Sequence, residues 1–395
     1  MESRSQPARE VYLDHAATTP MLPEAVAAML EEQRRVGNAS SLHGAGRASR
    51  RVVEESRERI AQALGARPAE VVFTSGGTEA DNLAVTGIVR RRGEEDSRRV
   101  RVLATAVEHP AVLEPLARLA QHEGVQVELV PVDETGRVDV GALQASVERD
   151  PGSVALVSLM WANNEVGTVQ PVDEAVAVAA PHGIPVHSDA VQAVGAVPVD
   201  VATSGVDALS VAAHKHGGPY GVGALVVRRG LEPRPLVHGG GQERGIRSGT
   251  VNRPAIAGFA VAVEHAVKHQ AETHERLAAL RDDLVARVRA EVPDVRLNGH
   301  PVHRLPGNAH LGFPGCEGDA LLMLLDREGI ACSTGSACSA GVPQASHVLL
   351  AMGRGVEEAR GSLRFTLGRT STAADVDAVV DVIGAAVARA RAAAR

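Results

Sequence analysis

The sequence has few of the features that mark secreted, membrane or disulfide-rich proteins. It has only three cysteines in 395 residues, Cys316, Cys332 and Cys338. This odd number lacks the spacing of a disulfide framework or a zinc site, and it predicts free thiols in a reducing, cytoplasmic compartment. No apolar run reaches the roughly 18 residues of a membrane span. The first ten residues, MESRSQPARE, contain no hydrophobic stretch, so we expect no secretory signal there.

The sequence also lacks an excess of positive charge. Its 41 basic and 48 acidic residues give a net charge of −7, which argues against a general affinity for nucleic acid or acidic membranes. The GxGxxG and Walker patterns are absent, so dinucleotide and nucleotide binding lose support. The 44% hydrophobic and 23% charged residues are typical of a globular protein of this length with about two domains.

Between about residues 70 and 228, short β-rich segments alternate with amphipathic helical segments. The strand candidates are EVVFTS (70–75), VRVLATA (100–106), SVALVSLMWA (153–162), IPVHSDA (184–190), VDALSVAAH (206–214) and VGALVV (222–227). Nearly continuous runs of Val, Ala and Leu predict a mainly parallel sheet that is covered by helices on both faces. The predicted fold class is therefore α/β.

The C-terminal third has a different pattern. A long helical segment (252–291) precedes two short strand-like pieces, a helix (317–329), a strand (362–368) and a final Ala/Arg-rich helix. This order predicts a smaller α+β domain with the N-terminal segment packed on it. We predict a large domain of residues 20–260 and a small domain of residues 1–19 and 261–395.

Polar residues follow the predicted strands of the large sheet. Ligands of open α/β sheets bind at the carboxyl ends of the strands, so these residues are the first candidates for a site. They are Thr74–Thr78, Glu108–His109, Asn163–Asn164, Asp189 and His214–Lys215.

Three of these features together predict a pyridoxal phosphate site. Alone, Lys215 fits a strand-end lysine that faces water, Asp189 fits a helix cap, and SGGT (75–78) fits an ordinary helix start. Together they supply a lysine for a covalent link to the cofactor, an acid for the pyridine nitrogen, and backbone N–H groups for phosphate. His214 and His216 do not suggest a metal site, because neighbouring residues on a strand face opposite ways.

The chain resembles the cysteine desulfurases, a class V branch of the fold-type I pyridoxal phosphate enzymes, from residue 12 to residue 369. The resemblance implies a large domain with a mainly parallel sheet of seven strands and a smaller α+β domain. The matching segments occur in the family order. They are YLDHAATTP (12–20), NASSLHGAGR (38–47), FTSGGTEADNLAVTG (73–87), EHPAV (108–112), NNEVGTVQP (163–171), DAVQ (189–192), HK (214–215), GGGQERGIRSGT (239–250), STGSACSAG (333–341) and LRFTLGR (363–369).

The resemblance implies roles for residues around the cofactor ring. Lys215 would hold pyridoxal 5'-phosphate covalently, and Asp189 would pair with the pyridine nitrogen. Gln192 and Asn164 would face the ring hydroxyl, and His109 would stack on the ring and join in proton transfer.

It also implies how phosphate and substrate are held. Gly77, Thr78 and His214 would bind the phosphate, together with Thr250 of a second subunit in a homodimer. Arg364 would bind the carboxylate of L-cysteine through its planar guanidinium, with Asn164 beside it.

Cys338 lies in STGSACSAG, a stretch without any large apolar side chain. The resemblance implies that its thiol takes the substrate sulfur and passes it to an acceptor protein. The 26 residues between Cys338 and Arg364 allow a long loop, similar to the desulfurases that feed iron–sulfur scaffolds and tRNA thiolation. In that group the cysteine can also ligate a cluster transiently, so Cys338 is a secondary candidate metal ligand. Cys316 and Cys332 fit structural or incidental roles.

Four positions depart from the family pattern. Ala212 stands where a phosphate-binding serine is common, and Ser210 is a doubtful replacement. His216 and Gly217 replace an aromatic pair, and His15 replaces the usual Asn or Tyr. We expect weaker phosphate binding and no loss of a catalytic group.

The predicted activity is conversion of L-cysteine to L-alanine with a persulfide on Cys338. Alternatives are another class V enzyme, such as a selenocysteine lyase or an aminotransferase, and a non-catalytic sulfur-trafficking scaffold. The sulfur acceptor and its pathway are not specified by the sequence.

Overall fold

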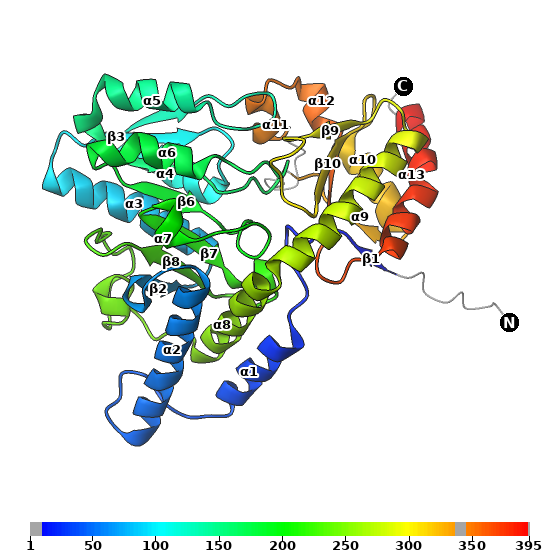
Figure 1. Ribbon diagram of the computed structural model, residues 1–395. Helices are drawn as coiled ribbons and strands as arrows, with labels where there is room; N and C mark the ends of the chain where they lie inside the picture. Colours follow the sequence, from blue (N-terminus) through cyan, green and yellow to red (C-terminus); the bar gives the residue numbers. More distant parts are fainter. Residues whose placement is uncertain (1–9, 336–344, 394–395) are drawn as a thin grey trace.

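Figure 1 shows the computed structural model of the chain, which describes residues 10–335 and 345–393. Cys338 lies outside the described residues, so the predictions about its thiol are not addressed by the structure.

The large sheet has seven strands, as expected, and most of its neighbouring strands are parallel. Strand β8 is antiparallel to both of its neighbours, β2 and β7. In spatial order the strands are β2 (Val71–Thr74), β8 (Gly223–Val227), β7 (Ala208–Ala212), β6 (Val186–Asp189), β5 (Val154–Ser158), β3 (Arg101–Thr105) and β4 (Gln126–Val130). The α/β fold class is confirmed. Strand β4 was not among the strand candidates, because at the sheet edge its residues are mostly part-exposed and include two polar side chains.

Helices cover both faces of this sheet (Figure 1). One hydrophobic core joins Phe73 and Leu209 of the sheet to Ile60 of α2 and Phe259 of α8. The other core packs α3 and α4 against the opposite face. The helices in this half are α1 (Pro23–Gln33), α2 (Gly44–Ala63), α3 (Gly77–Glu95), α4 (Pro110–Glu123), α5 (Val140–Arg149), α6 (Val172–Ala179), α7 (Val201–Ser204) and α8 (Arg253–Lys268).

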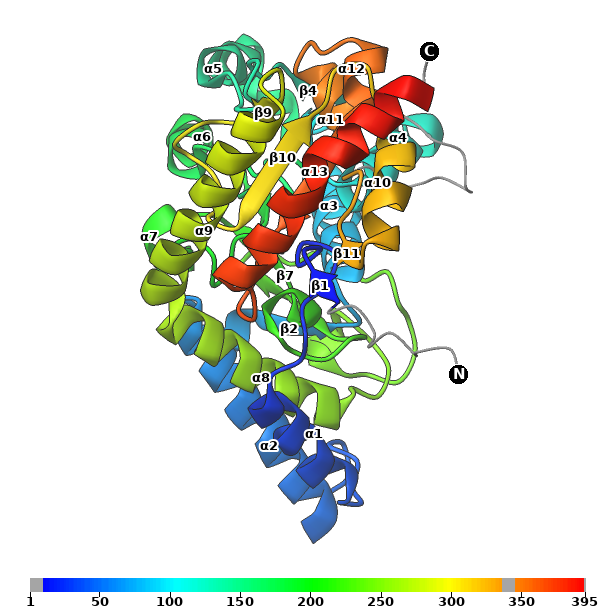
Figure 2. The same ribbon diagram turned by 90° about the vertical axis from the view of Figure 1, so that its right-hand side faces the viewer.

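A second, antiparallel sheet forms the other half of the molecule, with β10 between β12 and β9. The long helices α9 and α13 run across it (Figure 2), and its core includes Leu311 and Phe365. The elements are α9 (Gln270–Glu291), β9 (Arg296–Asn298), β10 (Asn308–Gly312), α10 (Gly318–Arg327), α11 (His347–Ala351), α12 (Val356–Arg360), β12 (Ser362–Thr366) and α13 (Ala373–Ala393).

The N-terminal segment packs on this second half, as expected. Strand β1 (Val11–Tyr12) pairs in parallel with β11 (Ile330–Ala331). The helical stretch 252–291 is two helices rather than one, because the chain leaves the helical conformation at His269. The domain boundary near residue 260 stays a proposal. In the described residues, no helix is both long enough and apolar enough to cross a membrane.

Candidate active site

A cavity of about 570 Å³ lies where the carboxyl ends of the parallel strands face the small sheet. It brings together nine residues that the sequence predicts: Gly77, Thr78, His109, Asn164, Asp189, Gln192, His214, Lys215 and Arg364. The strand-end residues thus line one cavity, and their roles there stay predictions. A second cavity lies on the other side of Lys215, Ala16 and Gln192, which line both.

Lys215 follows β7 in a short 3-10 helix, residues 213–216. Its Nζ donates hydrogen bonds to the carbonyl oxygens of Ala16 at 2.5 Å and Ala17 at 2.9 Å. Burial, helped by the nearby Arg364 cation, lowers the pKa of Lys215 to about 8. The amine is therefore much more available as a nucleophile than a free lysine.

This 3-10 helix corrects one step of the sequence reasoning. His214 and His216 do not lie on a strand. Residues two apart on a strand would also share a face, so the alternation argument against a metal site was wrong. Within the described residues, the three groups placed closely enough to share a cation are Asp81, His109 and Asp189 instead.

Asp189 ends strand β6 beside the strand that leads to Lys215. Its side chain is buried and accepts a hydrogen bond from the Val191 N–H at 2.9 Å. Burial raises the pKa of Asp189, and the neighbouring His109 and Lys215 oppose that shift. His109 caps α4 through its Nδ1, which accepts from the Ala111 N–H, and burial lowers the pKa of His109.

The start of α3 supplies the anion-binding part of the cavity. Helix N-termini leave N–H groups without intrahelical partners, and Gly77 and Thr78 bring this end to the cavity wall. Gly77 is required by packing, because a Cβ there would lie 2.8 Å from Cγ2 of Val191. Burial lowers the pKa of His214 to about 4, so its ring is neutral at pH 7.

The departure at position 212 is visible in the structure. Ala212 lines the cavity with a methyl group. Ser210 is fully buried, and its hydroxyl bonds to Nε2 of His187 at 3.0 Å. Ser210 therefore does not replace the missing hydroxyl.

Of the two neighbouring asparagines, only Asn164 lines the cavity. Asn163 is fully buried, and its Oδ1 accepts hydrogen bonds from the N–H groups of Glu165 and Val166. Asn163 thus shapes the turn that presents Asn164. Gln192 donates from Nε2 to the Ala16 carbonyl at 2.9 Å.

Arg364 enters from strand β12 of the small sheet, and only 5% of its side chain is exposed. Its Nη1 donates to the Asn164 carbonyl at 2.8 Å, and its Nη2 donates to Oδ1 of Asp14 at 2.7 Å. The small sheet therefore contributes a cation to a cavity whose other walls come from the large sheet.

The sequence reasoning gave no role to two other buried acids at this cavity, Asp81 and Glu108. Asp81 lines it, is 1% exposed, and its Oδ1 has no hydrogen-bond partner among the described residues. Glu108 lies behind it, fully buried, and accepts from the Met160 N–H and the Thr105 hydroxyl. Burial raises the pKa of Glu108 to about 8. A signal existed for Asp81, because it lies one helical turn after Thr78 and so shares its face.

Two predicted residues are not placed in the cavity. Thr250 is exposed on the segment between η5 (Glu243–Gly245) and α8, so its reach into a second subunit stays a prediction. Cys338 lies outside the described residues. Of the other cysteines, Cys316 is buried, and burial raises the pKa of Cys332 to about 12. Neither thiol has the properties of a nucleophile.

Comparisons with known proteins agree with this architecture. The family model of the class-V aminotransferases matches residues 11–379. An IscS-like cysteine desulfurase of Mycobacterium tuberculosis is 57% identical over 385 residues, covering 97% of this chain and 98% of the relative.

Two solved structures have the same fold. A NifS-like protein matches with a TM-score of 0.88 at 36% identity, covering 96% of this chain and 100% of the other. SspA in complex with cysteine matches with a TM-score of 0.79 at 33% identity, covering 90% and 98%.

The fold is thus that of fold-type I pyridoxal phosphate enzymes. The chain belongs to the class-V aminotransferase family and, within it, is a homologue of the IscS and NifS cysteine desulfurases.

Proposed function

We propose that this chain converts L-cysteine to L-alanine and retains the sulfur as a persulfide on Cys338. The observation that carries the proposal is the cavity itself. A lysine of lowered pKa, a buried acid, a helix N-terminus and a buried arginine all line this one cavity. None of these groups needs the others for packing, whereas an amino-acid substrate and pyridoxal phosphate need all four.

The residues present fit pyridoxal phosphate. Lys215 would hold it covalently, and the N-terminus of α3 with Thr78 and His214 would bind its phosphate. The buried carboxyl groups of Asp189 and Asp81 face this space, so a protonated pyridine nitrogen would supply the positive charge that they lack. Gln192 and Asn164 would face the ring hydroxyl. When bound, the cofactor supplies an electron sink for the carbanion at Cα of the substrate.

The chain's own side chains would then bind the amino acid and move its proton. The Arg364 guanidinium binds the substrate carboxylate. The neutral Lys215 amine takes the Cα proton, and the Ala16 and Ala17 carbonyls accept hydrogen bonds from the ammonium group that results. His109 lies in the same cavity, where it can stack on a planar ring and relay a proton.

Sulfur transfer is assigned to Cys338. Its thiolate attacks the substrate sulfur, so that an S–S bond forms and the C–S bond breaks. The electron pair of that bond remains with the carbon skeleton, which takes up a proton at Cβ, regains at Cα the proton held by Lys215, and leaves as alanine. A free thiol has a pKa of about 8.5 and is mostly protonated at neutral pH, so the site must favour the thiolate.

The persulfide would pass to an acceptor protein, either an iron–sulfur scaffold or a tRNA-thiolation protein, and Cys338 would be the residue able to ligate a cluster transiently. We place this chemistry in the cytoplasm, where three unpaired cysteines stay reduced.

We also propose a homodimer in which Thr250 reaches the phosphate of the second subunit. The segment that carries Thr250 is anchored to the large sheet by Glu243, whose carboxylate accepts from Arg57 and from the Phe73 N–H. Glu243 has a φ of 43°, a strained value for a residue other than glycine. This anchoring holds the segment in place while Thr250 itself stays exposed.

The test is release of alanine and sulfide from L-cysteine in the presence of a reductant. Cys338→Ala should abolish turnover and keep the cofactor, whereas Cys332→Ala should change turnover little. Full turnover by Cys338→Ala would refute the mechanism and favour an aminotransferase. Comparison of L-cysteine with L-selenocysteine separates the desulfurase from a selenocysteine lyase.

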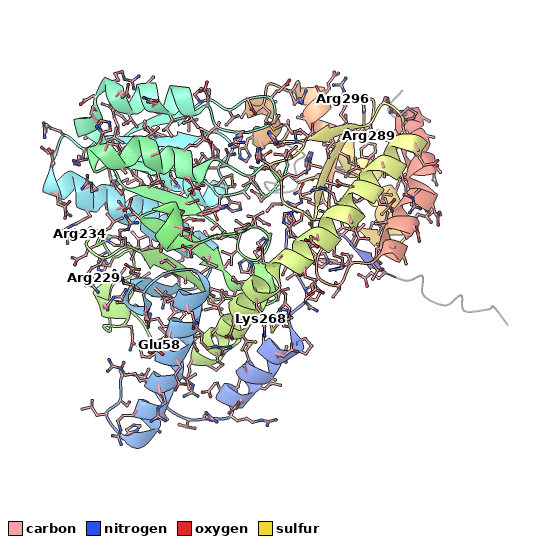
Figure 3. The ribbon with its side chains drawn as sticks, in the orientation of Figure 1. Glu58, Arg229, Arg234, Lys268, Arg289 and Arg296 are labelled. Atoms are coloured by element: carbon pink, nitrogen blue, oxygen red, sulfur yellow. The ribbon has the colours of Figure 1, made fainter. Side chains whose placement is uncertain are left out.

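The cofactor link has a matched control, because the chain has only two lysines. Lys215→Ala should lose the absorption band of the lysine-linked cofactor. Lys268→Ala, at the exposed C-terminal end of α8 (Figure 3), should keep it. A wild-type protein without that band would support the non-catalytic scaffold.

A further inference from the structure

The guanidinium of Arg364 is held before any substrate arrives. Asn164 and Asp14 each accept one hydrogen bond from it, on Nη1 and Nη2 respectively. Each Nη carries two N–H donors, so one N–H on each remains for a ligand. Two anchors on a planar group fix its plane as well as its position.

Asp14 is itself rigidly placed. Its backbone pairs with Thr366, two residues beyond Arg364 on β12. The Tyr12 hydroxyl donates to the Asp14 carbonyl at 3.0 Å and to the Thr18 carbonyl at 2.9 Å, which ties the turn together. The Asp14 side chain is 21% exposed, so its charge is only partly screened by solvent.

The same turn also holds the second cation of the site. Two residues after Asp14, the Ala16 carbonyl accepts from Lys215 and from Gln192, and the Ala17 carbonyl accepts from Lys215. The turn 14–17 thus provides acceptors for both positive groups that an amino-acid substrate must meet. The Asp14–Arg364 ion pair and the acceptors of Lys215 therefore lie on one turn at the cavity, which favours a role in the site over a role in stability alone.

We propose that Asp14 is a positioning residue for the substrate: it fixes the Arg364 guanidinium in the plane that binds an amino-acid carboxylate. This inference rests on the proposed function, because it takes the ligand to be an amino acid. Asp14 does not touch the reacting atoms. It sets the affinity for the carboxylate by fixing the direction of the two N–H groups of Arg364 that remain for a ligand.

The chemistry of the ligand gives a direct readout. L-alanine has the carboxylate of the substrate and no thiol, whereas 2-aminoethanethiol has the amine and thiol and no carboxylate. Both can be titrated into the holoenzyme by the change in the cofactor absorption band. Only the carboxylate-bearing ligand should depend on Asp14.

The experiment compares Asp14→Ala and Asp14→Asn with wild type. Asp14→Ala should weaken L-alanine binding and raise the KM for L-cysteine by about tenfold, with kcat within about twofold. Asp14→Asn keeps an acceptor oxygen and loses the charge, so a smaller effect of about threefold is expected. Binding of 2-aminoethanethiol and cofactor retention should not change. Asp294→Ala, which breaks an exposed pair with Arg391, is the control and should change none of these values.

If Asp14→Ala weakened the binding of L-alanine and of 2-aminoethanethiol equally, or lost the cofactor, Asp14 would have a merely structural role and the inference would be overturned. L-alanine affinity within twofold of wild type in both Asp14 variants would overturn it as well. If Asp14→Ala does not fold, Asp14→Asn decides. Failure of the proposed function is seen separately, as wild-type protein that makes no alanine from L-cysteine, because the L-alanine titration requires no turnover.

Discussion

The two walls of the cavity are built in different ways. On the large-sheet wall, His109, Asp189 and Lys215 each lie at the end of a strand or within four residues after it, so local sequence positions them. On the small-sheet wall, Arg364 is held by Asp14 and Asn164, which lie 350 and 200 residues away in the chain. The cofactor side is thus built from local strand ends, and the substrate side from contacts between distant segments.

This difference has a chemical consequence. The large-sheet wall offers buried acids and a lysine that face one another across a fixed sheet edge, which suits a resident cofactor. The small-sheet wall offers one guanidinium whose orientation depends on two separate anchors. Substitutions on the small-sheet wall should therefore change substrate binding more than the rate of the chemical steps.

The largest effect is expected on the cofactor wall. Asp189→Asn removes the negative charge that would keep the pyridine nitrogen protonated, so turnover should fall by about a thousandfold, or about 4 kcal/mol. The absorption spectrum and steady-state rates measure this. Asp207→Asn is the matched control, because that carboxylate accepts from the Val186 N–H at the opposite end of β6. Turnover of Asp189→Asn within a few-fold of wild type would show that the charge is not needed.

The second prediction concerns the protonation of Lys215, which depends on groups of both walls. The pKa of Lys215 is lowered to about 8, so its amine is protonated and unreactive below that pH and neutral above it. The rate at which cofactor-free protein takes up pyridoxal phosphate should therefore rise with pH and level off above about pH 8, rather than above about pH 10 as for a free lysine.

The Arg364 cation contributes to this lowering, after burial. Arg364→Ala should consequently move the midpoint to higher pH, while Arg369→Ala, whose guanidinium donates to the Pro20 carbonyl, should not. An unchanged midpoint in Arg364→Ala would mean that the two walls are electrostatically independent.

The smallest effect is expected for a substitution of Tyr12, whose hydroxyl holds the turn 14–18. Tyr12→Phe removes the single O–H donor that the carbonyls of Asp14 and Thr18 share, at a cost of about 1 kcal/mol in the free energy of unfolding. The KM for L-cysteine should rise by about two- to threefold, because Asp14 is held less firmly. Urea unfolding and steady-state kinetics measure the two quantities. Tyr220→Phe, which loses a bond to the Thr18 hydroxyl only, is the comparison, and a larger effect on KM there would contradict the role of Asp14.

The sequence was informative where a strand runs directly into a polar residue. Asp189 and Lys215 were found in this way, and their neighbourhood follows from β6 and β7 being adjacent and parallel. It failed at Lys215 in detail, because a 3-10 helix replaces the end of the strand. The doubt about Ser210 as a replacement agrees with the structure, because its hydroxyl bonds to His187. The sequence reasoning also missed β4, since an edge strand lacks a continuous apolar pattern.

The sequence by itself determined the α/β alternation, six of the seven strands of the covered sheet and the polar residues at its carboxyl edge, because hydrophobic periodicity and strand ends are local properties. Only the tertiary structure decided that Asp14 meets Arg364 and that the carbonyls of Ala16 and Ala17 meet Lys215. The pairing of the N-terminal segment with Thr366 creates those contacts, and no local pattern encodes it. The lowered pKa of Lys215 also depends on the tertiary structure, because it results from burial between the large-sheet and small-sheet walls of the cavity.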